Sequence, residues 1–326
     1  MDAAPQATGF ALVTVVIPTI NRPELVRRAI ESVARQTWPC LEIIVIVDGP
    51  DEATCDTLRR IDDPRLRVIR NDMPMGPGAA RNRAAQEARG AWIAFLDDDD
   101  EWLPDKLTRQ LAGRSPEDNV VLSCRCRVET PRAAYNWPQR LYGADEPIDE
   151  YLFARRSLRR SDAYLATPTV VLPRRLFLST GFGTTQQNED TTLLLRATKS
   201  MGAELVMLPD ILTVIHSEEA RWSTGSVFDW RDSLDWIDAM GSLITPRAYS
   251  GFLLVTLGSQ AADQGEVKAI GTLLNRAFRH GRPTLRQLAL FAAFWTVPQR
   301  LRRRCREALS RLGGLRAPPV SSRQPC

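Results

Sequence analysis

Three short apolar runs most constrain how this chain can fold. They are LVTVVI at residues 12–17, EIIVIV at 42–47 and AWIAFL at 91–96, and segments with a helical pattern lie between and after them. A strand buried on both faces has a continuous apolar run rather than an alternating one. This strand–helix alternation predicts a doubly wound α/β domain around a mostly parallel sheet.

Polar motifs stand directly after each of these runs. The motif PTINR at 18–22 follows the first, Asp48-Gly49 follows the second, and Asp97 to Asp100 follow the third. In open α/β sheets, ligands bind outside the carboxyl ends of the strands. We therefore expect the three motifs to meet in one site.

The rest of the chain indicates a helical pattern around and after this sheet. Apolar residues recur at helical spacing over 25–34, and Asn21 followed three residues later by Glu24 predicts a capping box. After the last expected strands the pattern is mainly helical. We expect an α/β catalytic domain over residues 1–225 and a C-terminal helical region over 226–326.

Composition narrows the chemistry. The chain has 326 residues with 44% hydrophobic and 25% charged side chains, as ordinary globular proteins do. No export signal is evident, so the six scattered cysteines are expected to be reduced thiols in the cytoplasm. Two histidines exclude a site built from several His ligands. A metal would need carboxylates, which suit Mg²⁺ or Mn²⁺.

The four aspartates at 97–100 need a reason to gather, because adjacent carboxylates repel one another. A bound dication would relieve this repulsion. The alternative is an acidic turn before a helix, whose N-terminal dipole favours Asp. The preceding buried strand and the two other strand-end motifs favour the ligand site.

The ordered fragments resemble the family 2 glycosyltransferases, which have the GT-A fold. The resemblance covers about residues 13–216 and rests on VVIPTINRPELVRRAIESV, EIIVIVDG, GPGAARNRAAQEARGAWIAFLDDDD, TPTVVLPRRLF and EDTTLLLR. It implies a GT-A-like sheet with helices on both faces. It also implies a metal-dependent, inverting transfer of a hexosyl group, with a UDP-sugar as the expected donor and a hydroxyl as the acceptor.

The resemblance also implies roles for the donor site. Asp97-Asp98-Asp99 matches the family's D-x-D, with Asp97 and Asp98 at the donor and Asp99 at the Mn²⁺ or Mg²⁺ ion. Asp48 matches the carboxylate that reads the base. The other residues expected at the nucleotide-sugar are Pro18, Thr19, Asn21, Arg22, Glu24, Gly76 and Arg81. Arg is a strong phosphate partner, although an Arg on an Ala-rich helix can also be a surface residue.

Glu189-Asp190 matches the family's catalytic E-D pair. Asp190 would be the general base that takes the proton of the acceptor hydroxyl. Without the resemblance, the pair would be an acidic helix N-terminus. His216 ends an expected strand, where it either contacts the metal or is a satisfied structural histidine.

The sequence departs from the family pattern at several places, and in one of them Asp48 follows Val47 rather than another Asp. Ile20 stands where an aromatic residue is frequent, Pro50 where Ser is common, and Thr191-Thr192 where aromatic or acidic residues often follow the E-D pair. These differences leave base identity and acceptor class open. The alternatives are a sugar nucleotidyltransferase and a non-catalytic nucleotide-sugar-binding protein. The spacing of GPGAARNRA does not fit a dinucleotide-binding loop.

The C-terminal end is strongly basic. Twelve Arg and one Glu after residue 274 give +11, so the total of +4 leaves −7 for the rest. The segment 299–312 predicts a basic amphipathic helix that binds an anionic membrane, or else packs on its own domain. We expect a cytoplasmic protein, peripheral on the inner membrane face, acting on a saccharide or lipid-linked acceptor. No nucleic acid is expected as a partner.

Overall fold

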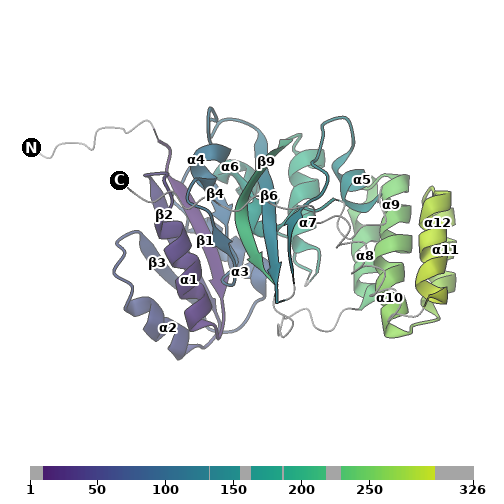
Figure 1. Ribbon diagram of the computed structural model, residues 1–326, viewed down its shortest axis with the longest axis horizontal. Coiled ribbons are helices and arrows are strands. Elements are labelled where there is room, and N and C mark those ends of the chain that lie inside the picture. The colour runs from purple at the N-terminus through teal and green to yellow at the C-terminus, as the bar shows by residue number, and fades with distance from the viewer. Residues whose placement is uncertain (1–9, 132, 155–162, 186, 218–228, 298–326) are drawn as a thin grey trace, which may run out of the picture.

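The computed structural model describes residues 10–131, 133–154, 163–185, 187–217 and 229–297 (Figure 1). The strands are β1 (Val13–Thr19), β2 (Leu41–Asp48), β3 (Leu66–Asn71), β4 (Trp92–Phe95), β5 (Glu101–Trp102), β6 (Val120–Thr130), β7 (Ala133–Trp137), β8 (Val171–Pro173) and β9 (Glu204–His216).

The α-helices are α1 (Pro23–Ala34), α2 (Glu52–Arg59), α3 (Pro77–Gln86), α4 (Lys106–Gln110), α5 (Ile148–Phe153), α6 (Arg174–Thr180), α7 (Glu189–Leu195), α8 (Trp230–Met240), α9 (Pro246–Gly251), α10 (Gly258–Gln264), α11 (Ala269–His280) and α12 (Leu285–Thr296). Short 3₁₀ helices occupy Thr167–Thr169 and Gly241–Leu243. Two π-helical segments, Arg196–Ser200 and Phe252–Leu257, continue α7 and join α9 to α10.

The first half of the sheet is parallel, as the apolar runs predict. Strand order is β3-β2-β1-β4-β8-β6-β9-β5, with β7 paired to β6. β1 lies between β2 and β4, with Val13 opposite both Leu41 and Trp92. Every residue of these three strands is buried. Their carboxyl ends therefore lie next to one another at one edge of the sheet.

The second half makes the sheet mixed rather than mostly parallel. β8 is antiparallel to β4 and β6, and β5 and β7 pair antiparallel with their neighbours. Antiparallel neighbours do not need the crossover connection that parallel neighbours require. The two closing strands expected over 204–208 and 211–215 are one strand, β9, whose register with β6 shifts near Arg125.

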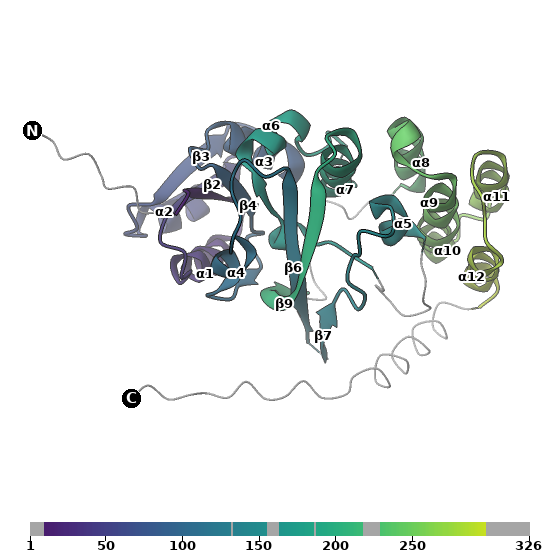
Figure 2. The ribbon, with the colours of Figure 1, turned by 90° about the horizontal axis from the view of Figure 1, so that it is seen from above.

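Helices cover both faces of the sheet (Figure 2). Val13, Val15 and Ile17 of β1 pack in one hydrophobic cluster with α1, α2 and α4. Val16 packs in a second cluster with α3, α6 and α7. Successive side chains of a strand point to opposite faces, which is why one apolar run supplies both clusters. The expected α/β class is confirmed.

The helices α8–α12 pack beside α5 and α7 and share the second hydrophobic cluster (Figure 1). The Trp236 indole N–H donates to Thr192 Oγ1 of α7 at 2.8 Å. Among the described residues, no helix is both long and apolar enough to cross a bilayer. The division at residue 225 and the basic segment 299–312 lie outside the described residues and stay predictions.

The expected capping box at Asn21 and Glu24 is wrong. Helix α1 begins at Pro23 with Arg22 as its N-cap and has no side-chain cap. Asn21 has a φ of 55° and lies one residue too early to be the N-cap. Its backbone N–H instead donates to Asp51, which also caps α2 by accepting from the Thr54 N–H at 3.0 Å.

Replacing Asp51 with Ala should therefore lower the free energy of unfolding by about 1–2 kcal/mol, because two backbone N–H groups, one of them buried, lose their acceptor. Urea denaturation measures this change. Asp56→Ala on the same helix is the control, since Asp56 is exposed and pairs only with Arg59. An equal effect of both changes would contradict the capping role of Asp51.

Candidate active site

The structure brings the expected strand-end motifs together. The Thr19 hydroxyl donates to Asp98 Oδ2 at 2.8 Å. Arg22 Nη1 donates to Asp98 Oδ1 at 2.9 Å and lies 3.3 Å from Asp99 Oδ2. The loop after β1 is thus tied to the loop after β4 through charged hydrogen bonds.

Asp98 is a buried anchor of this cluster. It is 5% exposed, and its burial raises its pKa to about 6. Both oxygens already accept hydrogen bonds, from Thr19 and from Arg22. Asp98 therefore holds the loops in place beneath the surface.

Arg81 connects Asp97 to the predicted catalytic pair. Its guanidinium is 5% exposed, forms an ion pair with Asp97 and lies 3.8 Å from Glu189 Oε1. It also lies over the Phe182 ring, 5.2 Å from the centroid. Burial, together with the nearby Asp190 carboxylate, raises the pKa of Glu189 to about 7. Arg81 is thus a buried cation between two carboxylates, not a surface Arg.

Helix α3 needs glycine at position 78, where it passes Glu189. A Cβ on Gly78 would lie 3.0 Å from the Glu189 Cγ and 3.2 Å from a backbone oxygen. The Gly-Pro-Gly start of α3 therefore lets Arg81 and Glu189 approach each other.

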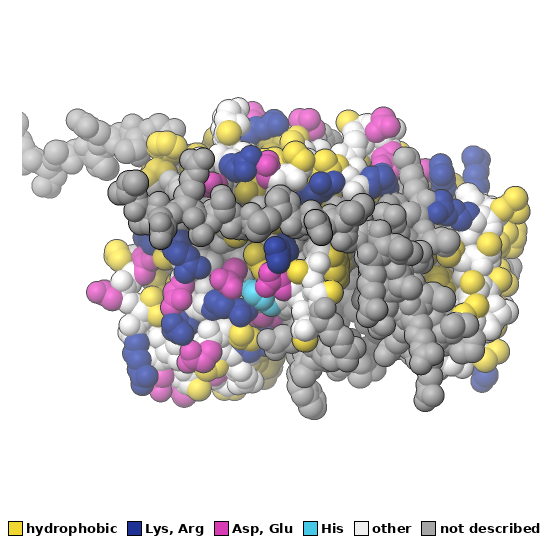
Figure 3. Space-filling view, in the orientation of Figure 1, with side chains coloured by type: hydrophobic (Ala, Val, Ile, Leu, Met, Phe, Trp, Pro, Cys, Tyr) yellow, Lys and Arg dark blue, Asp and Glu magenta, His cyan; other side chains and the backbone are white. Residues whose placement is uncertain are grey.

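The histidine belongs to the same edge of the sheet. The His216 backbone N–H donates to Asp100 Oδ1 at 3.1 Å, and its ring Nε2 lies 2.9 Å from Glu101 Oε1. Figure 3 shows acidic and basic side chains gathered beside a histidine on this face of the molecule. In this structure Glu101 is the partner of the His216 ring, so a metal-contacting role of His216 remains a prediction.

The carboxylates at this edge fit a hard dication for which the protein supplies only some of the ligands. Among the described residues, no group of three or more His, Cys, Asp or Glu side chains is placed to enclose a metal. Mg²⁺ and Mn²⁺ sites commonly use one or two carboxylates and complete their coordination with water and substrate phosphates. The carboxylate oxygens of Asp97 and Asp99, at the end of a buried strand, match that chemistry.

Asp48 holds the loop before α3. Its carboxylate, 6% exposed, accepts from the Asn71 side chain at 2.6 Å and from the backbone N–H groups of Met75 and Gly76 at 2.9 and 2.8 Å. Gly49 follows with a φ of 132°, and a Cβ there would meet the Pro74 ring at 3.0 Å. Asp48, expected to read the nucleotide base, thus also shapes the loop that leads into α3.

One expected donor residue lies apart from this cluster. The Glu24 side chain is 75% exposed, and its carboxylate lies 3.3 Å from Arg27 of its own helix. Asn21 contacts Asp51 through its backbone N–H rather than through its own side chain. The structure does not bring Glu24 to the aspartates.

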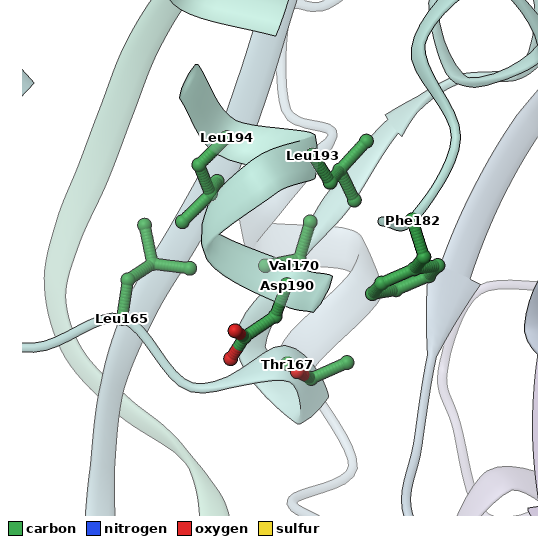
Figure 4. A pocket seen from close by; sticks show the side chains of 7 residues that line it. All are labelled: Leu165, Thr167, Val170, Phe182, Asp190, Leu193 and Leu194. Atoms are coloured by element: carbon green, nitrogen blue, oxygen red, sulfur yellow. The ribbon is translucent and has the colours of Figure 1, made fainter. Parts of the chain in front are cut away.

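Asp190 lines a small pocket in the first turn of α7 (Figure 4). The pocket encloses about 10 Å³, roughly the room of one water molecule. Burial raises the pKa of Asp190, while the Thr191 N–H donates to it at 2.6 Å. The other lining residues are Leu165, Thr167, Val170, Phe182, Leu193 and Leu194. A carboxylate in such apolar surroundings is suited to take up a proton.

The sequence patterns did not single out several residues of the site. Asp51 and Asn71 hold the loops, and Phe182 packs on Arg81. Tyr164 and Trp137 stack with ring centroids 3.8 Å apart. Asp51 offered one signal, an Asp after Gly-Pro at a helix start. The other four come from irregular or edge segments whose partners are distant in sequence.

Comparison with known proteins identifies the family. The family model described as Glycosyl transferase family 2 matches residues 14–179, about half of the chain. The chain belongs to glycosyl transferase family 2. In the first four curated relatives that it matches, the aligned segment spans 28% to 56% of their length.

Named relatives place this family 2 chain among sugar-transferring proteins. It is 36% identical over 100 residues to the Escherichia coli UDP-Glc:alpha-D-GlcNAc-diphosphoundecaprenol beta-1,3-glucosyltransferase WfaP, covering 31% of this chain and 40% of WfaP.

Two solved structures share its fold. The S. aureus TarS 1–349 complex with UDP-GlcNAc has a TM-score of 0.57 at 17% identity, with 95% of each chain covered. The mannosyltransferase PcManGT from Pyrobaculum calidifontis, in complex with GDP-Man and Mn²⁺, has a TM-score of 0.52 at 20% identity, covering 95% of this chain and 87% of that one. Both are GT-A-type glycosyltransferases, which confirms the expected fold.

Replacing Asp48 with Ala should speed amide hydrogen exchange at Met75 and Gly76, because both N–H groups lose a charged acceptor. We expect roughly a tenfold or larger change, without any nucleotide present. Exchange mass spectrometry or NMR measures it. Asp56→Ala should leave both amides protected; unchanged exchange in Asp48→Ala would remove Asp48 from loop positioning.

Proposed function

We propose that this chain is a metal-dependent, inverting glycosyltransferase that moves a hexosyl group from a UDP-sugar to a hydroxyl of a lipid-linked saccharide. One observation carries the proposal. Buried Arg81 joins Asp97, on the donor side, to Glu189 in the predicted catalytic pair. Sugar transfer needs these two functions side by side, a charged donor site and a carboxylate base.

The donor proposal rests on the loops after β1, β2 and β4. Arg22 and Arg81 supply guanidinium groups, the preferred partners of phosphates, beside the aspartates. The names of TarS and WfaP support a UDP-sugar, whereas PcManGT is named with GDP-Man. Asp48 would contact the base in concert with the loop that it holds.

The chemistry follows from Asp190. The acceptor oxygen would form a bond to the anomeric carbon while its proton passes to the Asp190 carboxylate. The bond between the anomeric carbon and the diphosphate oxygen breaks, and the diphosphate leaves with the electron pair. Attack from the side opposite the diphosphate inverts the anomeric centre. Glu189 would assist through its charge and its contact with Arg81.

Asp99 would hold Mn²⁺ or Mg²⁺, with Asp97 at the donor sugar beside it. When bound, the ion would neutralise charge on the leaving diphosphate. Arg81 and Arg22 contribute positive charge of the same kind from the protein itself. His216 would extend this group only if its ring released Glu101.

We also propose the class of acceptor and the location of the protein. The relative WfaP is named for a diphosphoundecaprenol-linked acceptor, which supports a lipid-linked saccharide. A peripheral position at the inner face of a membrane would suit such an acceptor and the Arg-rich C-terminal segment. Family membership favours sugar transfer over the alternative of a sugar nucleotidyltransferase.

Two substitutions should separate the donor site from the base. Asp99→Ala should lose metal-dependent donor binding. Asp190→Asn should keep donor binding, within a few fold, and lose transfer by about a hundredfold or more, because the amide cannot accept the proton. A panel of nucleotide-sugars with Mn²⁺ or Mg²⁺, scored by released nucleotide and by donor binding, measures both.

The exposed Asp56→Ala variant is the control and should bind and turn over like the wild type. Normal turnover by Asp190→Asn would reject Asp190 as the base. Failure of every nucleoside diphosphate to bind the wild type would reject the proposed function.

As the pH is lowered, transfer should be lost at a higher pH than it would be with an aspartate base of ordinary pKa. A general base works only when deprotonated, and burial raises the pKa of Asp190 above its usual value. The turnover rate should therefore fall as pH falls through this raised pKa. The pH profile of turnover at saturating donor measures it, with donor binding followed in parallel. A flat profile down to about pH 4 would contradict the prediction.

A further inference from the structure

An aromatic pair stands beside the predicted base. Trp137 is the last residue of β7, and its ring stacks on Tyr164 with an interplanar angle of 10°. Tyr135 meets the Trp137 ring edge at 6.4 Å between centroids. All three rings are partly exposed, and they pack on Cys126 and Val128 of the neighbouring strand β6. This small cluster is separate from the two main hydrophobic clusters.

Tyr164 belongs to the segment that forms the pocket of the base. The next residue, Leu165, and Thr167 both line the pocket that contains the Asp190 carboxylate. Burial raises the pKa of Tyr164, and Asp190 is the largest charged influence that raises it further. Among the described residues, no hydrogen bond to the Tyr164 hydroxyl is present. The hydroxyl is therefore available as a donor to a ligand.

The Trp137–Tyr164 pair lies across the site from the loops that are proposed to bind the nucleotide. Those loops follow β1 and β2, whereas Trp137 belongs to β7 on β6, and β4 and β8 lie between in the sheet order. Inverting displacement needs the acceptor on the side opposite the leaving diphosphate. The aromatic pair thus borders the side from which an acceptor hydroxyl would reach Asp190.

We propose that Trp137 and Tyr164 form an acceptor subsite, in which a pyranose ring packs its C–H face on the aromatic pair and receives a hydrogen bond from the Tyr164 hydroxyl. This inference rests on the proposed function. Aromatic rings with a polar tip bind half-polar ligands because they offer apolar area and one directed donor. Sugars present both an apolar C–H face and hydroxyl groups.

Three variants test the subsite. Trp137→Ala removes the stacking face, Trp137→Phe keeps a ring, and Tyr164→Phe keeps the ring but removes the hydroxyl. The probes are methyl β-glycosides of common hexoses, with UDP present, observed by saturation-transfer NMR. The exposed Phe278→Ala on α11 is the matched aromatic control.

Methyl-glycoside affinity should fall roughly tenfold in Trp137→Ala and a few fold in Tyr164→Phe, and Trp137→Phe should restore most of it. UDP affinity should stay unchanged in all three. This split between glycoside and nucleotide binding separates a binding role from a structural one.

Three results would overturn the subsite. The first is unchanged glycoside affinity in the variants, and the second is no glycoside binding to a wild type that binds UDP. The third is equal loss of glycoside and UDP binding with a lower melting temperature, which would mean that the pair only packs the β6–β7 hairpin. A wild type that binds no nucleoside diphosphate would instead reject the proposed function.

Discussion

The repulsion between gathered carboxylates is the constraint on which the site depends. Two like charges about 4 Å apart cost about 4 kcal/mol at an effective dielectric constant of 20. The protein offsets this cost with two arginines that come from different elements. Arg22, before α1, pairs with Asp98 and Asp99. Arg81, within α3, joins Asp97 and Glu189. These ion pairs therefore link the positions of the loops and helices to the positions of the carboxylates.

The two halves of the sheet position different parts of the site. The parallel half, β3-β2-β1-β4, aligns three strand ends and so places the loops proposed for the donor. The mixed half carries residues that we propose act on the acceptor side of the reaction. It brings the pocket around Asp190 and the Trp137–Tyr164 pair to the same edge. A fully parallel sheet would have needed a crossover helix for each of these strands.

Features that arise from local pattern could be predicted from the sequence. The buried strands β1, β2 and β4 were evident because each has a continuous apolar run, and the meeting of their end motifs follows from parallel pairing. The capping box failed because the backbone takes a left-handed turn at Asn21, which Asp51 stabilises from another loop.

Features that arise from distant partners could not be predicted in this way. The three hydrogen bonds of Asp48, the placement of Arg81 between two carboxylates and the ring stack of Trp137 on Tyr164 all join segments far apart in sequence. The family resemblance supplied roles for single residues, but it did not supply these contacts.

Asp149 connects the C-terminal helices to the helix that carries the predicted base. This aspartate of α5 is fully buried, pairs with Lys199 at the end of the α7 segment and accepts from the Thr245 N–H before α9. Together with the Trp236–Thr192 hydrogen bond, it makes α7 and the helices behind it one unit. An engineer who exchanges the C-terminal helices between family members would therefore have to move α7 with them.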